Sequence, residues 1–269
     1  MGNYLDTELT DILSKELDNK GVQVITGAKI ESYEGTEAVS AVKASDAEYP
    51  SDLIIQAAGV KPNTDWLKGT VDLDKRGWIK TDKYLRTSLP DVYAIGDAVL
   101  AYSIPARKNM PIALATVARR EARYVAEHIF ENMPSMPFSG VVGSSALSVF
   151  DYHFATSGLN ITTAQKAGIE IHTSFYKDTL RPAYVPMEKG NTEVYVELDY
   201  NPSSTIRWRC IVNLRYHCQG NVISLAIQQG LKLEDLAEAD FFFQPSFDRQ
   251  WSLLNLAVQH ALGELEFTK

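Results

Sequence analysis

The sequence predicts an α/β chain that ends in a separate α+β domain. Its 269 residues suggest about two domains. The continuous apolar run Leu-Ile-Ile at 53–55 is typical of a buried strand in a parallel sheet. Residues 131–140 contain two prolines and a glycine, which indicates a linker. Beyond this linker the pattern changes to strands followed by helices, as in α+β domains.

The N-terminal part predicts a helix, a strand and a small β hairpin. Residues 5–19 place apolar side chains on one helical face, with Asp6 as a candidate N-cap. The next segment, VQVITG at 22–27, predicts a short strand. Residues 30–44 predict a hairpin that turns at a Glu-Gly pair. The apolar run at 53–55 follows as the buried strand.

The middle of the chain predicts short strands and one long helix. Residues 77–97 contain two short strands, the second of which ends in a Gly-Asp pair. A helix is expected from about 112 to 130, because apolar residues recur on one side of it. Past the linker we expect strands at 146–158, 169–177 and 192–200 and helices at 220–230 and 251–262. In the last of these strands the side chains of Val194, Val196 and Leu198 alternate toward the core.

Composition excludes several classes of protein. A net charge of −8 disfavours a non-specific binder of nucleic acid, which needs clustered Lys and Arg. No apolar run reaches the ~18 residues that a membrane span needs. The two cysteines, Cys210 and Cys218, are too few for a disulfide scaffold, and no His pair has zinc-helix spacing. We therefore expect a cytoplasmic protein without a metal site.

The pair Gly96-Asp97 is the clearest candidate binding feature. An Asp at the carboxyl end of a parallel strand lies where α/β sheets bind ligands, and the glycine allows close approach. The carboxylate can accept hydrogen bonds from sugar or polyol hydroxyls, and the next helix offers free N–H groups at its N-terminus. These features fit reduced flavin, but taken alone they favour an ordinary turn in which Asp97 caps a helix, because Gly-Asp turns are common.

Several segments, in the same order, resemble flavoprotein reductases that have two dinucleotide-binding domains. TSLPDVYAIGD at 87–97 matches their second flavin motif, and DLIIQAAGVKPN at 52–63 is similar to the segment that joins the NAD and flavin domains. IALATVARREAR at 112–123 resembles the helix at the flavin ring. Residues 144–160 and 239–251 resemble the interface domain of the NADH peroxidase, NADH oxidase and CoA-disulfide reductase branch. The chain thus resembles the FAD-dependent pyridine nucleotide-disulfide oxidoreductases.

This resemblance implies a domain plan and an assembly. Residues 1–58 would be the C-terminal part of an NAD-binding domain and 59–138 that of an FAD-binding domain, both Rossmann-like. Residues 139–269 would be an α+β dimerisation domain that makes a homodimer. The sequence contains no G-x-G-x-x-G loop and no counterpart of the family's redox cysteine. We therefore expect roughly the C-terminal three-fifths of such a protein, inactive by itself.

The resemblance also implies cofactor contacts. Asp97 would hydrogen-bond the ribityl chain of FAD, with Gly96 allowing its close approach. The other implied contacts are Ala113, Leu114, Ala115 and Thr116 at the flavin pyrimidine edge, Gly59 at NAD and Tyr4 beside the adenosine. Each of these has ordinary packing as its alternative. No catalytic residue is expected in this chain.

Two functions follow as hypotheses. In the first, hydride passes from NADH through FAD and a redox cysteine to peroxide or oxygen, and this chain supplies half of the flavin site. In the second, the chain is a non-catalytic dimerisation module. Dimerisation is expected in both, because the segment 241–251 holds more large aromatic residues than a small domain can bury. Residues 205–220 depart from the family pattern, which led us to the hypothesis of a local reading-frame slip.

Overall fold

The structure is a computed structural model that describes residues 5–131, 134–203, 205–212 and 217–263. It divides into two compact units. The smaller unit is Ser14–Lys61, and the larger comprises Met1–Leu13 and Pro62–Lys269. The helix α1 (Thr7–Asn19) begins in the larger unit and ends in the smaller one, and it confirms the helix predicted for residues 5–19.

The smaller unit contains a three-stranded antiparallel sheet. Its strands are β1 (Ile30–Gly35), β2 (Val39–Ala44) and β3 (Glu48–Pro50), in that order. The predicted hairpin is confirmed, and β3 extends it. Gly35 makes the turn possible, because its φ is +145° and an added Cβ would lie 2.0 Å from the Ala38 carbonyl oxygen.

Two strands predicted in this unit are wrong. Neither 22–27 nor 53–55 forms a strand, and Leu53 and Ile55 are 78% and 84% exposed. A parallel strand needs hydrogen-bonded neighbours, and none of the described strands pairs with either segment. Apolar runs alone therefore did not decide the backbone conformation here.

Residues 62–131 form a small, mostly irregular region in front of one long helix. The prediction of two strands within 77–97 is wrong. Their residues pair with other segments only at isolated β-bridges, such as Arg86 with Tyr93, and form no continuous ladder of hydrogen bonds. The regular elements are η1 (Asp65–Leu67), η2 (Gly96–Ala98), the hairpin of β4 (Ala101–Ser103) and β5 (Lys108–Met110), and α2 (Ala115–His128). Helix α2 confirms the long predicted helix, starting three residues later than expected.

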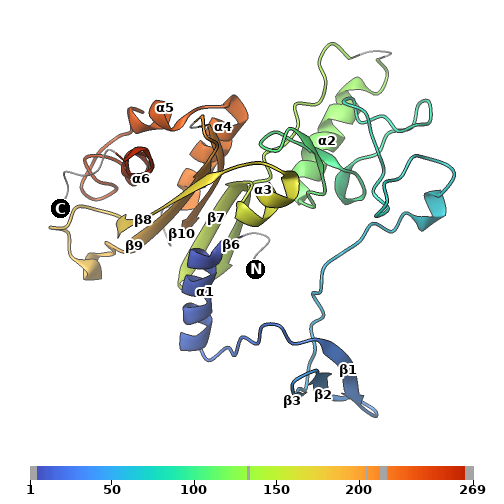
Figure 1. Ribbon diagram of the computed structural model, residues 1–269, viewed down its shortest axis with the longest axis horizontal. Helices are drawn as coiled ribbons and strands as arrows, with labels where there is room; N and C mark the ends of the chain where they lie inside the picture. The colour runs from blue at the N-terminus through green and yellow to red at the C-terminus, as the bar shows by residue number, and fades with distance from the viewer. Residues whose placement is uncertain (1–4, 132–133, 204, 213–216, 264–269) are drawn as a thin grey trace. The chain divides into compact units, whose positions relative to one another are not determined.

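A five-stranded antiparallel sheet organises the rest of the chain (Figure 1). Its order is β6-β7-β10-β9-β8. The strands are β6 (Ser145–Val149), β7 (Tyr152–Gly158), β8 (His172–Thr179), β9 (Glu193–Tyr200) and β10 (Ile206–Val212). Residues 146–158, predicted as one strand, are instead a hairpin, with Phe150 in the turn at a φ of +46°. The unusual segment 205–220 thus contributes a central strand, and residues 213–216 lie outside the described part.

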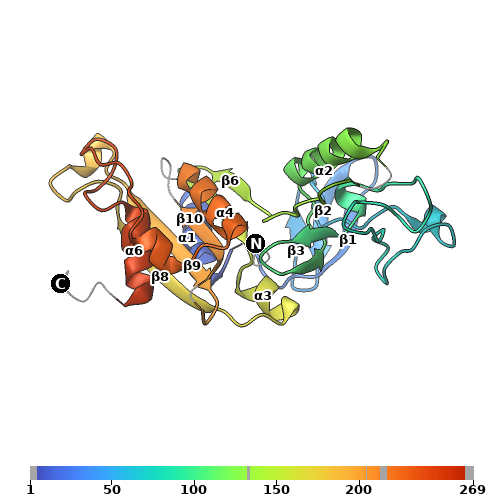
Figure 2. The same cartoon turned by 90° about the horizontal axis from the view of Figure 1, so that it is seen from above.

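Helices cover one face of this sheet. They are α4 (Gly220–Gln229), α5 (Leu233–Ala237) and α6 (Leu253–Leu262), with α3 (Ile161–Ala167) following β7. Figures 1 and 2 show α4 and α6 on the same face of the sheet. The side chains of Val194, Val196 and Leu198 point into this layer and are at most 1% exposed, as their alternation predicted. Helices α3 and α5 were not predicted.

The opposite face of β9 is also buried, which the sequence did not predict. Glu197 and Asp199 are both fully buried there. The Thr173 hydroxyl donates a hydrogen bond to Asp199 Oδ1 at 2.5 Å, whereas both oxygens of Glu197 lack a partner in the described part. Burial, reinforced by the negative charge of Asp6, raises the pKa of Glu197 to about 9 and that of Asp199 to about 8.

The start of α1 approaches this acidic face. The Ile161 amide of α3 donates to Asp6 Oδ2 at 3.4 Å, and burial raises the pKa of Asp6 to about 6. Asp6 therefore faces α3, although its sequence pattern suggested a cap for its own helix. Leu9 and Leu13, on the same side of α1, are buried. The N-terminal turns of α1 are thus an integral part of the larger unit.

Candidate flavin site

The Gly96-Asp97 pair forms a tight turn that packs against α2. Gly96 has a φ of +78° and begins the short helix η2. Its amide donates a hydrogen bond to Glu121 Oε2 of α2 at 2.7 Å. An added Cβ on Gly96 would lie 3.6 Å from the Cβ of Ala118, so η2 and α2 are in close contact. Asp97 is exposed, and within the described part no hydrogen bond or ion pair engages its carboxylate.

The N-terminus of α2 is open. Its N-cap position is occupied by Leu114 in an extended conformation, and no side chain caps it. The amides of Ala115 and Thr116, both exposed, have no hydrogen-bond acceptor among the described residues. A 14-residue helix with free first-turn N–H groups favours a negative charge at this end.

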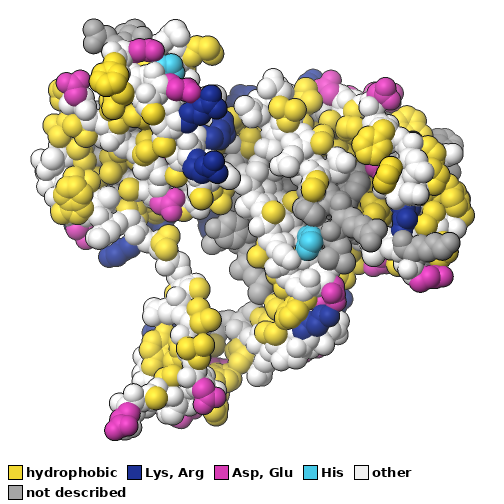
Figure 3. Space-filling model, turned by 180° about the vertical axis from the view of Figure 1, so that it is seen from behind, with side chains coloured by type: hydrophobic (Ala, Val, Ile, Leu, Met, Phe, Trp, Pro, Cys, Tyr) yellow, Lys and Arg dark blue, Asp and Glu magenta, His cyan; other side chains and the backbone are white. Residues whose placement is uncertain are grey.

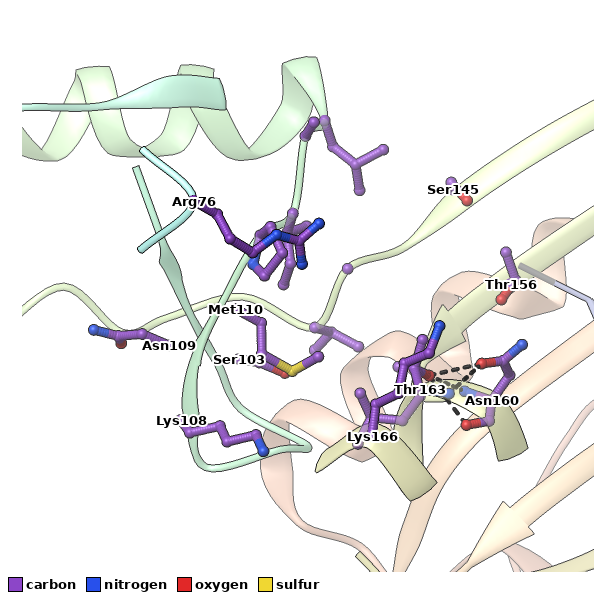
Figure 4. A pocket seen from close by; sticks show the side chains of 18 residues that line it. Arg76, Ser103, Lys108, Asn109, Met110, Ser145, Thr156, Asn160, Thr163 and Lys166 are labelled. Atoms are coloured by element: carbon purple, nitrogen blue, oxygen red, sulfur yellow. Dashed lines mark hydrogen bonds between the residues drawn. The ribbon is translucent and has the colours of Figure 1, made fainter. Parts of the chain in front are cut away.

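A cavity of about 530 Å³ opens beside this helix end (Figure 4). Segments from β5, β7 and α3 contribute to it, and Ala113 and Leu114 form part of its wall. Arg76, Lys108 and Lys166 line it, and no Asp or Glu does. Figure 4 shows Arg76 on one side and Asn160, which caps α3, on another. This cavity is therefore positive in a chain of net charge −8.

Positive charge is also visible on the molecular surface. Figure 3 shows Lys and Arg side chains gathered in one patch on the face seen from behind. Within the cavity, Lys108 is held in place, because its Nζ donates to the Ala167 carbonyl oxygen at 2.8 Å. A local surplus of cations next to an open helix N-terminus suits a ligand group with delocalised negative charge.

Glu121 is the one functional candidate in this region that sequence reasoning missed. It is fully buried, and with Val117 it forms the buried side of α2. Burial is the main cause that raises its pKa, and Asp97 adds to it, while the Gly96 amide and Arg120 oppose it. Glu121 follows Val117 by four residues, so helical periodicity places it on the apolar face of the helix. A charged residue at an apolar position is the sequence signal that could have identified it.

These residues fit one side of a flavin. A free carboxylate at Asp97 suits ribityl hydroxyls, and two free amides suit the pyrimidine edge, where flavin carries negative charge when reduced. The cavity gives room beside the helix end. The glycine-rich loop that cradles a pyrophosphate is not in this sequence. The donor set therefore matches the ring and ribityl parts of FAD.

Comparison with known proteins identifies the family. Residues 1–122 match the pattern described as pyridine nucleotide-disulphide oxidoreductase. Over 98% of its length the chain is 32% identical to an NADH oxidase of Enterococcus faecalis, and over 96% it is 30% identical to one of Streptococcus pyogenes. The chain belongs to the pyridine nucleotide-disulphide oxidoreductase family.

Solved structures of this family agree with the fold. The water-forming NADH oxidase from Lactobacillus brevis, bound to NADH, matches 98% of this chain and 58% of its own at a TM-score of 0.90 and 31% identity. The chain spans 59% and 56% of the length of the two curated oxidases. FAD and NADH are the cofactors of this family, which confirms the cofactors expected from the resemblance.

The remaining predicted contacts, Gly59 and Tyr4, lie outside the part of the larger unit that the structure describes. Gly59 lies in the smaller unit, where it is exposed with a φ of +98° and open space around its Cα. Tyr4 lies outside the described residues. The larger unit thus gathers Gly96, Asp97 and the start of α2, and the roles of Gly59 and Tyr4 stay predictions.

Two other expectations concern the described residues as a whole. Within them, no group of His, Cys, Asp and Glu is arranged to hold a metal ion. No described helix is both long enough and apolar enough to cross a membrane.

Proposed function

We propose that this chain provides the ribityl and pyrimidine side of the FAD site in an NADH oxidase. The observation that carries the proposal is the contact of η2 with α2, which places a free carboxylate on one element and an open helix N-terminus on the other. FAD held by Asp97 and the first-turn amides of α2 would supply the hydride-transfer chemistry between NADH and the electron acceptor. The similarity to NADH oxidases supports this reaction class.

Each part of the site has a defined task in this proposal. Asp97 accepts hydrogen bonds from ribityl hydroxyls and so fixes the chain of the cofactor. The amides of Ala115 and Thr116 donate to the pyrimidine edge and stabilise negative charge there. Leu114, half-buried beside them, excludes water from that edge. None of these residues transfers a proton or an electron.

The proposed division of labour follows the predicted domains. Residues 1–58 belong to an NAD-binding domain, where Gly59 at its edge and Tyr4 contact NAD(H), and 59–138 belong to the FAD-binding domain. On this proposal the chain by itself holds FAD weakly and does not turn over NADH, because it lacks a pyrophosphate cradle and a matching redox cysteine. Oxygen is the acceptor that the similar oxidase structure favours, and peroxide is the alternative.

We also propose a homodimer formed through residues 139–269. Phe241 packs on the domain core, but Phe242, Phe247 and Trp251 are 70%, 65% and 51% exposed. An exposed aromatic group of this size is typical of an interface core, and two-fold pairing covers it most simply. The same observation favours the second hypothesis, a dimerisation module, should no flavin bind.

Titration with flavin separates these hypotheses. The purified full chain is titrated with FAD and, because ring and ribityl contacts suffice, with FMN, and flavin fluorescence is recorded. We expect weak binding, with a dissociation constant well above the micromolar range. In Asp97→Ala we expect a further loss of about 5- to 150-fold, from a hydrogen-bond contribution of roughly 1–3 kcal/mol. Asp72→Ala, another exposed Asp of the same unit, is the matched control.

The possible outcomes are distinct. Equal affinities for the wild type and Asp97→Ala remove Asp97 from the site. Sub-micromolar FAD affinity contradicts the expected loss of the pyrophosphate contacts. A dimer that binds neither FAD nor FMN at millimolar concentration supports the dimerisation module. Analytical ultracentrifugation of Phe242→Ser/Trp251→Ser tests the dimer itself, and a wild-type chain that sediments as a soluble monomer rejects it.

A further inference from the structure

The flavin contacts proposed above leave one buried group unexplained. Glu121 is fully buried in α2, and only one of its two oxygens has a hydrogen-bond partner in the described part. Burying a carboxyl group costs free energy, and here a single backbone amide compensates for it. An aliphatic side chain at this position would pack on the same face of the helix without that cost. The bond to Gly96 is thus the feature that distinguishes Glu121 from a core residue.

We infer that Glu121 is a positioning residue of the flavin site, which holds the Gly96-Asp97 turn in register with the open end of α2. The inference rests on the proposed function, because it concerns how Asp97 and the first-turn amides are kept in place. Glu121 itself does not touch the cofactor in this account. It acts through the backbone of the residue that precedes Asp97.

The geometry makes this bond an effective link. Gly96 is the first residue of η2, so an anchor on its amide fixes the backbone one residue before Asp97. Glu121 and Ala115 lie on one continuous helix, six residues or about 9 Å apart along its axis. The rigid helix therefore sets the spacing between the hydroxyl acceptor and the amide donors. At the other end of η2, the Ala98 carbonyl oxygen accepts a hydrogen bond from the Ile79 amide at 2.8 Å. The Glu121 bond is therefore the hydrogen bond that joins η2 to α2, and it is not the only anchor of η2 among the described residues.

Three substitutions separate positioning from packing. Glu121→Gln keeps an oxygen acceptor at nearly the same place, whereas Glu121→Met keeps the volume and removes the acceptor. Glu121→Ala is a second acceptor-free variant, in case the methionine disturbs folding. Glu127→Met makes the same change on an exposed position of the same helix and is the matched control.

The experiment uses the ¹⁵N-labelled full chain and FMN as the probe. Hydrogen exchange of the Gly96 amide reports the link, and FMN-induced shifts of the Asp97 and Ala115 amides give the dissociation constant. In Glu121→Met and Glu121→Ala we expect Gly96 exchange to be at least tenfold faster and FMN binding about tenfold weaker. Glu121→Gln restores both values to within about twofold, and Glu127→Met leaves both unchanged.

Results that overturn the inference can be distinguished from results that overturn the proposed function. If FMN shifts Asp97 and Ala115 equally in the wild type and Glu121→Met, the link does not position the site and the inference fails alone. If Gly96 exchange is the same in all variants, the link itself is absent. If FMN leaves both amides unshifted in the wild type, the proposed function fails first. Failure of Glu121→Gln to rescue assigns the residue to packing.

Discussion

Glu121 and Glu197 are both fully buried glutamates, but their surroundings differ. One oxygen of Glu121 accepts a hydrogen bond from the Gly96 amide, whereas neither oxygen of Glu197 has a partner in the described part. Burial raises the pKa of both, and the charges of Asp6 and Asp199 add to the effect on Glu197. Burial of a carboxyl group therefore does not by itself show that the group stabilises the fold. Whether it does depends on the hydrogen-bond partner that it meets.

This difference predicts opposite effects of similar substitutions. The largest is expected at Glu197, where replacing the unpaired carboxyl by leucine should raise the free energy of unfolding at pH 7 by roughly 2–3 kcal/mol. The reason is that the wild type must either protonate or bury a charge there. Urea denaturation at pH 7 measures the change. A destabilised Glu197→Leu variant would show that the carboxyl has a stabilising partner, and the contrast would disappear.

The pH dependence of stability sharpens the same point. The pKa of Glu197 is raised in the folded chain to about 9 from an ordinary 4.5, and that of Asp199 to about 8 from 3.8. Protons therefore favour the folded state, so this contribution is complete below about pH 4 and is lost as the pH rises toward 9. We expect Glu197→Gln/Asp199→Asn to flatten the fall of the urea midpoint between pH 5 and pH 9. If the urea midpoint of the variant and that of the wild type fell in parallel with pH, this expectation would be wrong.

At Glu121 the sign should reverse. Glu121→Met leaves the Gly96 amide without an acceptor, and we expect a loss of roughly 1–2 kcal/mol in unfolding free energy. Glu121→Gln retains the acceptor and should stay close to the wild type. The measurement is again urea denaturation at pH 7, with Glu197→Leu in parallel. If Glu121→Met and Glu197→Leu both stabilised the fold, the two buried glutamates would behave alike and the predicted contrast would be wrong.

The smallest effect is expected at an exposed carboxylate of the same helix. Glu127 accepts a hydrogen bond from Arg123 Nε at 2.7 Å, but both side chains are more than half exposed. Water and salt screen such a pair, so Glu127→Gln should leave the thermal midpoint unchanged within error. A shift as large as that of Glu121→Met would mean that charge on α2, rather than the link to Gly96, controls stability.

Periodicity predicted the elements that local patterns determine. The alternation of Val194, Val196 and Leu198 identified the buried face of β9, and the apolar stripe of residues 112–130 identified α2. The same reasoning failed at 53–55, where an apolar run was predicted to be a strand. A run of apolar residues says nothing about which chain segments are available as hydrogen-bonding neighbours. Short helices such as α3, with their caps, were missed for lack of a long pattern.

The candidate site was found by its resemblance to family motifs, because the chemistry of the residues alone did not separate a cofactor site from a turn. The pair Gly96-Asp97 was physically compatible with a simple turn, and the resemblance of 87–97 to a flavin motif favoured a cofactor. Family membership and the cofactors FAD and NADH are confirmed, whereas the contacts of individual residues stay predictions. Glu121 lies within the motif quoted at 112–123, but the sequence assigned no role to it, and only the structure shows its contact with the Gly96 amide.

The sequence by itself determined the local features of this protein. These are the helices and strands with regular apolar patterns, the turn at Gly35, which requires a glycine, and the motifs that carry the family resemblance. Such features depend on neighbours within a few residues, where backbone sterics and side-chain spacing act directly. Only the tertiary structure decided that Glu121 accepts a hydrogen bond from Gly96 and that Glu197 has no donor among the described residues. These contacts join distant segments, and the free energy of a buried carboxyl depends on the partner that folding brings to it.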